Sequence, residues 1–169
     1  MKSEPPIHDL LVAFLLVQNT LKRRSDEFFQ SFGLTDAQFN ILNLLAVNGG
    51  PMDQFDVTER LLVGKSSVSI VLNRMVKAGL IRRDEHLKDR RRVVLSLTPK
   101  GKKIWSKASP GYEKGVQDIF GSLARENRNS FLDELATLYS AMKKSTKGVS
   151  HDGPSLTLRE TMHQLSTIT

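Results

Sequence analysis

The sequence predicts a mainly α-helical protein with one small β-ribbon. Apolar residues recur at helical spacing in several separate segments, which indicates amphipathic helices. Two short stretches near the middle of the chain have strand character, and a very polar segment separates them. With 169 residues, of which 39% are hydrophobic, the chain can form one domain with a true core and some extensions.

The first two predicted helices precede the middle of the chain. Apolar residues recur at roughly helical period from Ile7 to about Phe32, and Gly33 then ends this helix. Thr35-Asp36-Ala37-Gln38 has the spacing of a capping box, in which the threonine and glutamine side chains satisfy backbone groups at a helix start. The second helix begins there and ends at Asn48-Gly49-Gly50-Pro51.

Two shorter helices joined by a tight turn come next. Asp53 can cap a helix from Gln54 to about Leu62, and a turn at Val63-Gly64 leads into a second helix from Lys65 to Ala78. That helix has a clean buried stripe at i, i+3, i+4, i+7 and i+8, formed by Val68, Val71, Leu72, Met75 and Val76. Gly79 is well placed as the residue just beyond its end.

The predicted ribbon consists of Leu80–Asp84 and Val93–Leu97, and His86–Arg92 forms its polar tip. Thr98-Pro99 predicts the start of another helix, with the threonine as cap and the proline in the first turn. We expect Pro110-Gly111 to kink this helix.

The end of the chain has one more strong helical pattern. Gly121–Arg125 predicts a break, and Glu126–Lys144 predicts the last long helix. Ser145–Ser155 has the composition of a linker, and Leu156–Leu165 is either a short amphipathic helix or disordered.

Two short helices, a tight turn and a following ribbon make a winged helix-turn-helix. A helix fits the major groove of DNA when its inner stripe is apolar and its outer face is small, polar and basic. The helix from Lys65 to Ala78 meets both conditions, and no acidic residue lies on its outer face. The candidate DNA-binding residues on it are Lys65, Ser66, Ser67, Ser69, Asn73, Arg74 and Lys77.

The tip of the ribbon adds a second group of cations. Lys88, Arg90, Arg91 and Arg92 lie there, and arginine is favoured in a narrow minor groove because the potential is most negative there. Asp89 would be repelled by DNA if it were unpaired, so we expect it to support DNA binding by fixing the rotamer of a neighbouring arginine.

The distribution of charge agrees with a polyanionic partner. The net charge is +7, but Arg60–Lys103 alone carries 13 basic and 3 acidic residues, and the remainder of the chain is slightly acidic. A concentrated basic patch is the electrostatic footprint of nucleic acid, although a solvated basic face or an acidic lipid surface would have the same composition.

The chain resembles the MarR family of bacterial winged-helix regulators at three places. These are Leu34–Phe39, then Lys65–Ser69 continuing to Gly79-Leu80-Ile81, and the wing signature Asp89-Arg90-Arg91 with Val94, Leu97-Thr98 and Gly101 after it. The resemblance covers about Ile7–Lys144. A departure is Leu62, which stands where the family often has glycine.

The resemblance implies a homodimer formed by the first helix and the last two, with an effector pocket between the dimerisation and DNA-binding parts. It also implies that Arg91 enters the minor groove and that Asp89 orients it. The expected organisation is therefore an N-terminal dimerisation helix (1–33), a winged helix-turn-helix (34–98), C-terminal dimerisation helices (99–144), and a linker and tail of unassigned role (145–169).

Three residues are candidates for an effector pocket, namely Gln18, Asn43 and Trp105. Trp105 could equally pack in the core or a dimer interface together with Tyr112, because aromatic stripes at helical spacing usually do so. Gln18 and Asn43 could instead face solvent.

Several other functions are disfavoured by what the sequence lacks. It has no cysteine, so disulfides, thiol redox sensing and cysteine-ligated zinc are excluded. Its four histidines lack metal-ligand spacing, and no catalytic or phosphate-loop motif is present. We therefore expect neither an enzyme nor a cofactor nor a metal site. The longest apolar run, Leu10–Val17, is too short to span a membrane.

These observations predict a cytoplasmic, homodimeric, ligand-responsive repressor that binds a pseudo-palindromic operator in double-stranded DNA. The expected effector is a small amphipathic or anionic molecule. The alternative is a winged-helix module for protein–protein interaction, whose basic face docks an acidic partner. An apolar outer face on the second short helix would favour that alternative, and only Ile70 supports it.

Overall fold

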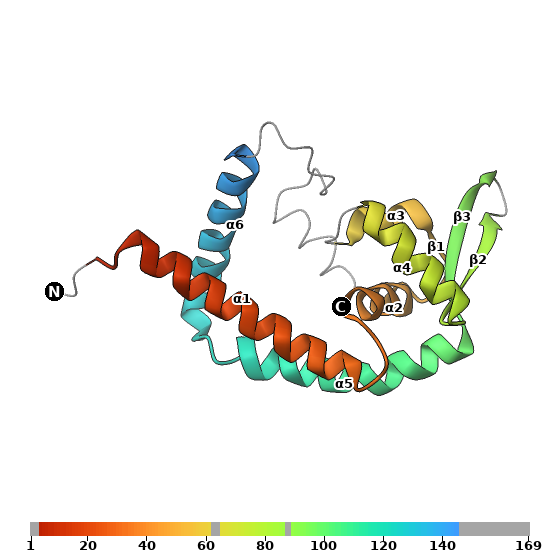
Figure 1. The fold of residues 1–169 in the computed structure, drawn as a ribbon, viewed down its shortest axis with the longest axis horizontal. Coiled ribbons are helices and arrows are strands. Elements are labelled where there is room, and N and C mark those ends of the chain that lie inside the picture. Colours follow the sequence, from red (N-terminus) through yellow and green to blue (C-terminus); the bar gives the residue numbers. More distant parts are fainter. Residues whose placement is uncertain (1–3, 62–64, 87–88, 146–169) are drawn as a thin grey trace. The chain divides into compact units, whose positions relative to one another are not determined.

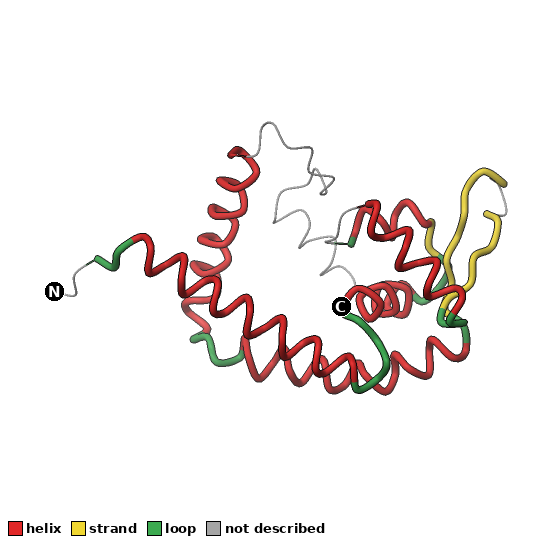
Figure 2. Tube along the Cα trace, viewed as in Figure 1, coloured by secondary structure: helices red, strands yellow, loops and turns green. Residues whose placement is uncertain are grey.

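The computed structural model of the chain describes residues 4–61, 65–86 and 89–145 (Figure 1). It divides into two compact units, residues 1–36 and 37–169. Helices dominate, and the short strands of the second unit are drawn in yellow in Figure 2. The predicted fold class, mainly helical with a small ribbon, is confirmed. Among the described residues, no helix combines the length and the apolarity needed to cross a membrane.

The first unit consists mainly of helix α1 (Ile7–Gln30), as the apolar period predicted. Phe29 is its one buried residue within the described helix. The aromatic ring of Phe28 contacts those of Phe29 and Phe32, with centroids 5.1 and 5.2 Å apart. The other large apolar side chains of α1 are largely exposed, and they include Leu10, Leu11, Phe14, Leu15, Leu16, Val17 and Leu21.

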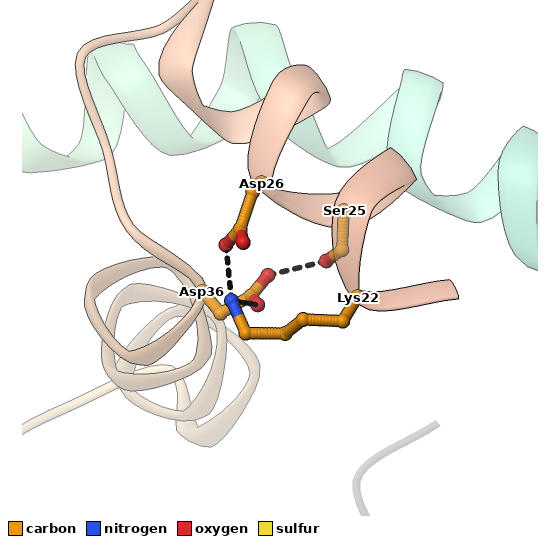
Figure 3. A network of polar contacts seen from close by, with 4 residues as sticks. All are labelled: Lys22, Ser25, Asp26 and Asp36. Atoms are coloured by element: carbon orange, nitrogen blue, oxygen red, sulfur yellow. Dashed lines mark hydrogen bonds and ion pairs between the residues drawn. The ribbon is translucent and has the colours of Figure 1, made fainter. Parts of the chain in front are cut away.

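A polar network closes the end of this unit (Figure 3). The Lys22 ammonium contacts the carboxylates of Asp26 and, at 3.4 Å, Asp36, while the Ser25 hydroxyl donates to Asp36. The hydrogen bond to Asp26 is the main reason that the pKa of Lys22 is raised above its ordinary value. Because Lys22 is exposed, water screens these pairs and they contribute little to stability.

The second unit is built around α2 (Asp36–Asn48). Only the first residue of this helix, Asp36, belongs to the first unit. Five of the apolar side chains of α2 are buried, namely Phe39, Ile41, Leu42, Leu44 and Leu45. The ring of Phe39 lies 4.9 Å, centroid to centroid, from that of Tyr112. This contact agrees with the interpretation of Tyr112 as a packing residue.

The helix-turn-helix consists of α3 (Gln54–Arg60) and α4 (Lys65–Lys77). Asp53 caps α3 as predicted, because its side chain accepts a hydrogen bond of 2.8 Å from the backbone N–H of Phe55. The predicted turn at Val63-Gly64 and the departure at Leu62 lie outside the described residues.

The sheet has three antiparallel strands in the order β1-β3-β2. They are β1 (Met52–Asp53), β2 (Ile81–His86) and β3 (Asp89–Leu97), and a register irregularity lies between Glu85 and His86. The sequence did not predict β1, which pairs with β3 at Leu95 and Val94. The prediction that His86–Arg92 is entirely a tip was also wrong, because both strands continue into it. Positively charged side chains on an exposed ribbon do not prevent the backbones from pairing.

The C-terminal half of the second unit contains α5 (Pro99–Phe120), a 3₁₀ turn (Arg125–Asn127) and α6 (Arg128–Ser145). The predicted break after Phe120 is confirmed. Helical structure continues through Pro110, so the proline interrupts the hydrogen bonding without ending the helix. The predicted linker and Leu156–Leu165 lie outside the described residues, apart from Ser145 at the end of α6.

A tight joint connects the end of α4, the base of the ribbon and the start of α5. The Thr98 hydroxyl donates to the carbonyl of Gly79 at 2.6 Å and accepts from the backbone N–H of Gly101 at 3.0 Å. A Cβ atom on Gly101 would lie only 2.0 Å from the carbonyl oxygen of Leu80, so this position has room for glycine alone. The backbones of α4, the ribbon and α5 therefore pack directly against one another here.

Candidate nucleic-acid interface

The apolar stripe of α4 fixes which face of this helix is free. Val68, Leu72 and Met75 are at most 1% exposed, so the helix is held on the domain as the sequence predicted. The opposite face is exposed and presents Ser69, Ile70, Asn73, Arg74 and Lys77. Lys65, Ser66 and Ser67 occupy the first turn of α4, and the structure does not describe their side chains.

The C-terminal end of α4 is closed by a glycine turn and a lysine. Gly79 has φ +68°, and the backbone N–H groups of Gly79 and Leu80 donate to Val76 and Met75, each at 2.9 Å. This is the arrangement expected of a Schellman motif. In addition, the ammonium of Lys100 donates to the carbonyl of Ala78 at 2.7 Å, which places a cation at the negative end of the helix dipole.

Arg83 is a residue of this face that the sequence interpretation missed. It lies on β2, and its Nη1 donates to Oδ1 of Asn73 on α4 at 2.6 Å. Side chains alternate along a strand, so Arg83 shares a face with Ile81, which is buried. That alternation was the signal that could have placed Arg83 beside α4.

The wing, which is the ribbon of β2 and β3, is only partly described. Lys88 lies outside the described residues, and Asp89, Arg90 and Arg91 belong to β3 while their side chains are not described. Their DNA contacts, and the expected pairing of Asp89 with an arginine, therefore stay predictions.

Arg92 has a partner within the domain. Its Nε donates to Oδ2 of Asp53 at 2.7 Å, and the Asp53 side chain is only 9% exposed. Because Oδ1 of the same carboxylate caps α3, one side chain ties the returning strand of the wing to the start of the helix-turn-helix. Half of the Arg92 side chain is exposed, so the predicted contact of Arg92 with DNA is compatible with this ion pair.

Two of the three effector candidates lie together. The indole N–H of Trp105 on α5 donates to Oδ1 of Asn43 on α2 at 3.0 Å, and both residues are half-buried. Trp105 also lines a cavity of about 230 Å³, whose polar lining includes Arg82, Lys102 and Ser96. The Ser96 hydroxyl is buried and has no hydrogen-bond partner among the described residues. Gln18 is an exposed residue of α1, in the other unit.

Sequence and structure comparisons agree with this arrangement. The model of the MarR family matches residues 32–92. The regulator FarR of Neisseria gonorrhoeae, an HTH-type transcriptional regulator, is 34% identical over 105 residues, which are 62% of this chain and 71% of FarR. The chain belongs to the MarR family.

Two solved structures share the fold of this protein. AbsC from Streptomyces coelicolor, a MarR-family regulator, matches with a TM-score of 0.70 and 26% identity, covering 88% of this chain and all of AbsC. NadR in complex with 4-hydroxyphenylacetate matches with a TM-score of 0.61 and 28% identity, covering 82% of this chain and 97% of NadR. The protein is thus a winged-helix member of a family of DNA-binding transcriptional regulators.

Proposed function

We propose that this MarR-family protein is a ligand-responsive repressor that binds a pseudo-palindromic operator as a homodimer. The observation that carries the proposal is the exposed face of α4, which is polar and basic while its opposite face is buried in the domain. A helix held in this way can lie in the major groove with Ser69, Asn73 and Arg74 directed at the DNA.

The apolar surface of the single chain supports the homodimer. Leu10, Val17 and other apolar residues of α1 are more than half exposed, which is unusual for a monomer. In the second unit, a mostly apolar groove of about 330 Å³ lies between the end of α5 and α6, lined by residues such as Phe120, Phe131 and Leu135. A second copy would cover such surfaces, and two-fold symmetry would set two α4 helices about one DNA turn, roughly 34 Å, apart.

The function is tested by titrating the full-length protein against duplex DNA from the region upstream of its own gene. We expect a retarded complex on this DNA at a concentration at which a shuffled duplex of the same composition stays free. Affinity should fall steeply with salt, because bound phosphates release counterions. Equal affinity for both duplexes at every salt concentration would contradict a sequence-specific repressor.

The wing contributes a second expected result. Arg91→Ala should weaken operator binding by about 1–3 kcal/mol and flatten the salt dependence, since one cation fewer contacts DNA. Asp89→Ala should also weaken binding if Asp89 orients Arg91, although it removes a charge that DNA repels. Tighter operator binding by Asp89→Ala at every salt concentration would mean that the wing is only a charged patch.

The proposed effector is a small aromatic anion. NadR was solved with such a molecule, 4-hydroxyphenylacetate, and the cavity beside Trp105 offers two cations, Arg82 and Lys102. Trp105 is the single tryptophan of the chain, so its fluorescence reports on this cavity alone. Titration with 4-hydroxyphenylacetate should change the fluorescence and release DNA, whereas the uncharged alcohol analogue should do neither. An unchanged spectrum at millimolar concentration would exclude this ligand class at this cavity.

A further inference from the structure

The contact between α4 and β2 constrains what Asn73 can recognise. Oδ1 of Asn73 accepts a hydrogen bond of 2.6 Å from Nη1 of Arg83, and both residues are exposed. The guanidinium group has donors only, so the amide atom that faces it must be the oxygen. This fixes the orientation of the amide.

An asparagine that reads DNA usually pairs with adenine. In that pairing the amide oxygen accepts from N6 of the base and the amide nitrogen donates to N7. Here Oδ1 already accepts from a cation, so one of its two lone pairs is occupied, and the positive charge beside it disfavours a further donor. The adenine pairing is therefore disfavoured at this position.

What remains exposed at the contact is a set of donors. The NH₂ group of Asn73 and the remaining N–H groups of Arg83 all donate, and the one acceptor of the pair, Oδ1 of Asn73, already holds a hydrogen bond. Guanine is the base that presents two acceptors, O6 and N7, in the major groove. The two residues thus complement guanine and discriminate against adenine.

We propose that Arg83 and Asn73 together contact one base of each operator half-site through their hydrogen-bond donors, and that they specify guanine at that position. This inference rests on the proposed function, because it assumes that α4 enters the major groove. Arg83 acts here both as a contact and as a positioning residue for Asn73.

Arg82 is a matched control for Arg83, and because it also lines the cavity beside Trp105, the selections are made without effector. It is the preceding residue on β2 and also an exposed arginine, but its Nε pairs with Asp84 at 2.9 Å. Because neighbouring side chains of a strand point to opposite faces, Arg82 lies on the other side of the ribbon. Arg82→Ala and Arg83→Ala therefore remove the same charge, and only the second removes the contact with Asn73.

The test is selection of bound sites from randomised duplex DNA by the full-length wild type, Arg83→Ala, Arg82→Ala, Asn73→Ala and the double variant of Arg83 and Asn73. We expect a guanine in each wild-type half-site that Arg82→Ala retains. Arg83→Ala should change the preference at that position from guanine to adenine, because it frees Oδ1 of Asn73. The ratio of guanine to adenine should fall roughly 5- to 150-fold, as expected for one good base contact. The double variant should lose the preference altogether.

The outcomes separate this inference from the proposed function. If the wild type selects a palindromic site but Arg83→Ala keeps the same base preferences, the assignment of guanine to Arg83 and Asn73 is wrong and the repressor proposal stands. The assignment is also wrong if Arg83→Ala and Asn73→Ala change the base preferences independently of each other. If the wild type selects no consensus, both proposals fail. The substituted side chains are exposed, so unchanged thermal unfolding should accompany each variant.

Discussion

Helices α1 and α4 both carry an apolar stripe at helical spacing, but within the described residues only the stripe of α4 is buried. On α4, Leu72 and Met75 are fully buried, whereas Leu10, Phe14 and Leu21 on α1 are between 40% and 58% exposed. The difference shows that an apolar stripe indicates a need for a partner surface and does not say which molecule provides it. For α4 the partner surface is the domain itself, and for α1 we propose a second copy of the chain.

The largest expected effect concerns the covered stripe. Leu72→Ala should lower the free energy of unfolding by about 2–5 kcal/mol, because it leaves a cavity in a fully packed site. Chemical denaturation measures this loss. Ile70→Ala on the exposed side of the same helix is the control, and it should change stability by less than about 0.5 kcal/mol. If the two variants lowered the free energy of unfolding equally, α4 would not pack on the domain through the face that carries Leu72.

The joint that seals the end of α4 gives the second prediction. Gly101→Ala should destabilise the fold by about 1–3 kcal/mol, since its Cβ would lie 2.0 Å from a backbone oxygen that cannot move aside alone. Gly115→Ala on the same helix has no atom within 4 Å of the new Cβ. It should leave stability unchanged or raise it by about 0.5–1 kcal/mol, because alanine favours a helix over glycine. Thermal unfolding of both variants decides whether the joint is as close as the structure has it.

The uncovered stripe gives the third prediction. Wild type should scatter light as twice the chain mass of 19.0 kDa at micromolar concentration. Phe14→Glu should raise the dimer dissociation constant about tenfold or more, because an unpaired polar group buried at an interface costs about 1–3 kcal/mol. Asn19→Glu adds the same charge on the side of α1 opposite Leu10, Phe14 and Leu21, and it should leave the dimer intact. If wild type is a monomer, or if both variants dissociate equally, the proposed role of α1 is wrong.

Signals that act within a few residues were readable from the sequence. Asp53 was recognised as a cap and Gly79 as a helix end, because each depends on its immediate neighbours. The stripe of α4 was found for the same reason, since its period is set within one helix. These local signals were enough to predict the helix-turn-helix and the ribbon.

Features that depend on distant partners were missed. Strand β1 has only two residues, and its partners on β3 lie about forty positions further along the chain. The pairs Arg83–Asn73 and Arg92–Asp53 likewise require knowledge of which elements lie side by side. For this reason the sequence indicates Arg92 only as a DNA contact and gives no sign of the contact made by Arg83. The contacts of Asp89, Arg90 and Arg91 with DNA stay predictions.

The attachment of α5 has a mechanical consequence. Its first turn is bound to the end of α4 through Thr98 and Lys100, so we expect a tilt at the start of α5 to be transmitted to α4. The 22 residues of α5 make an arm about 33 Å long. A displacement of about 3 Å at the Phe120 end corresponds to a rotation of about 5° at the other, by the same helix geometry. If α5 moves as a rigid body, it acts as a lever that converts small shifts near α6 into changes in the angle of α4.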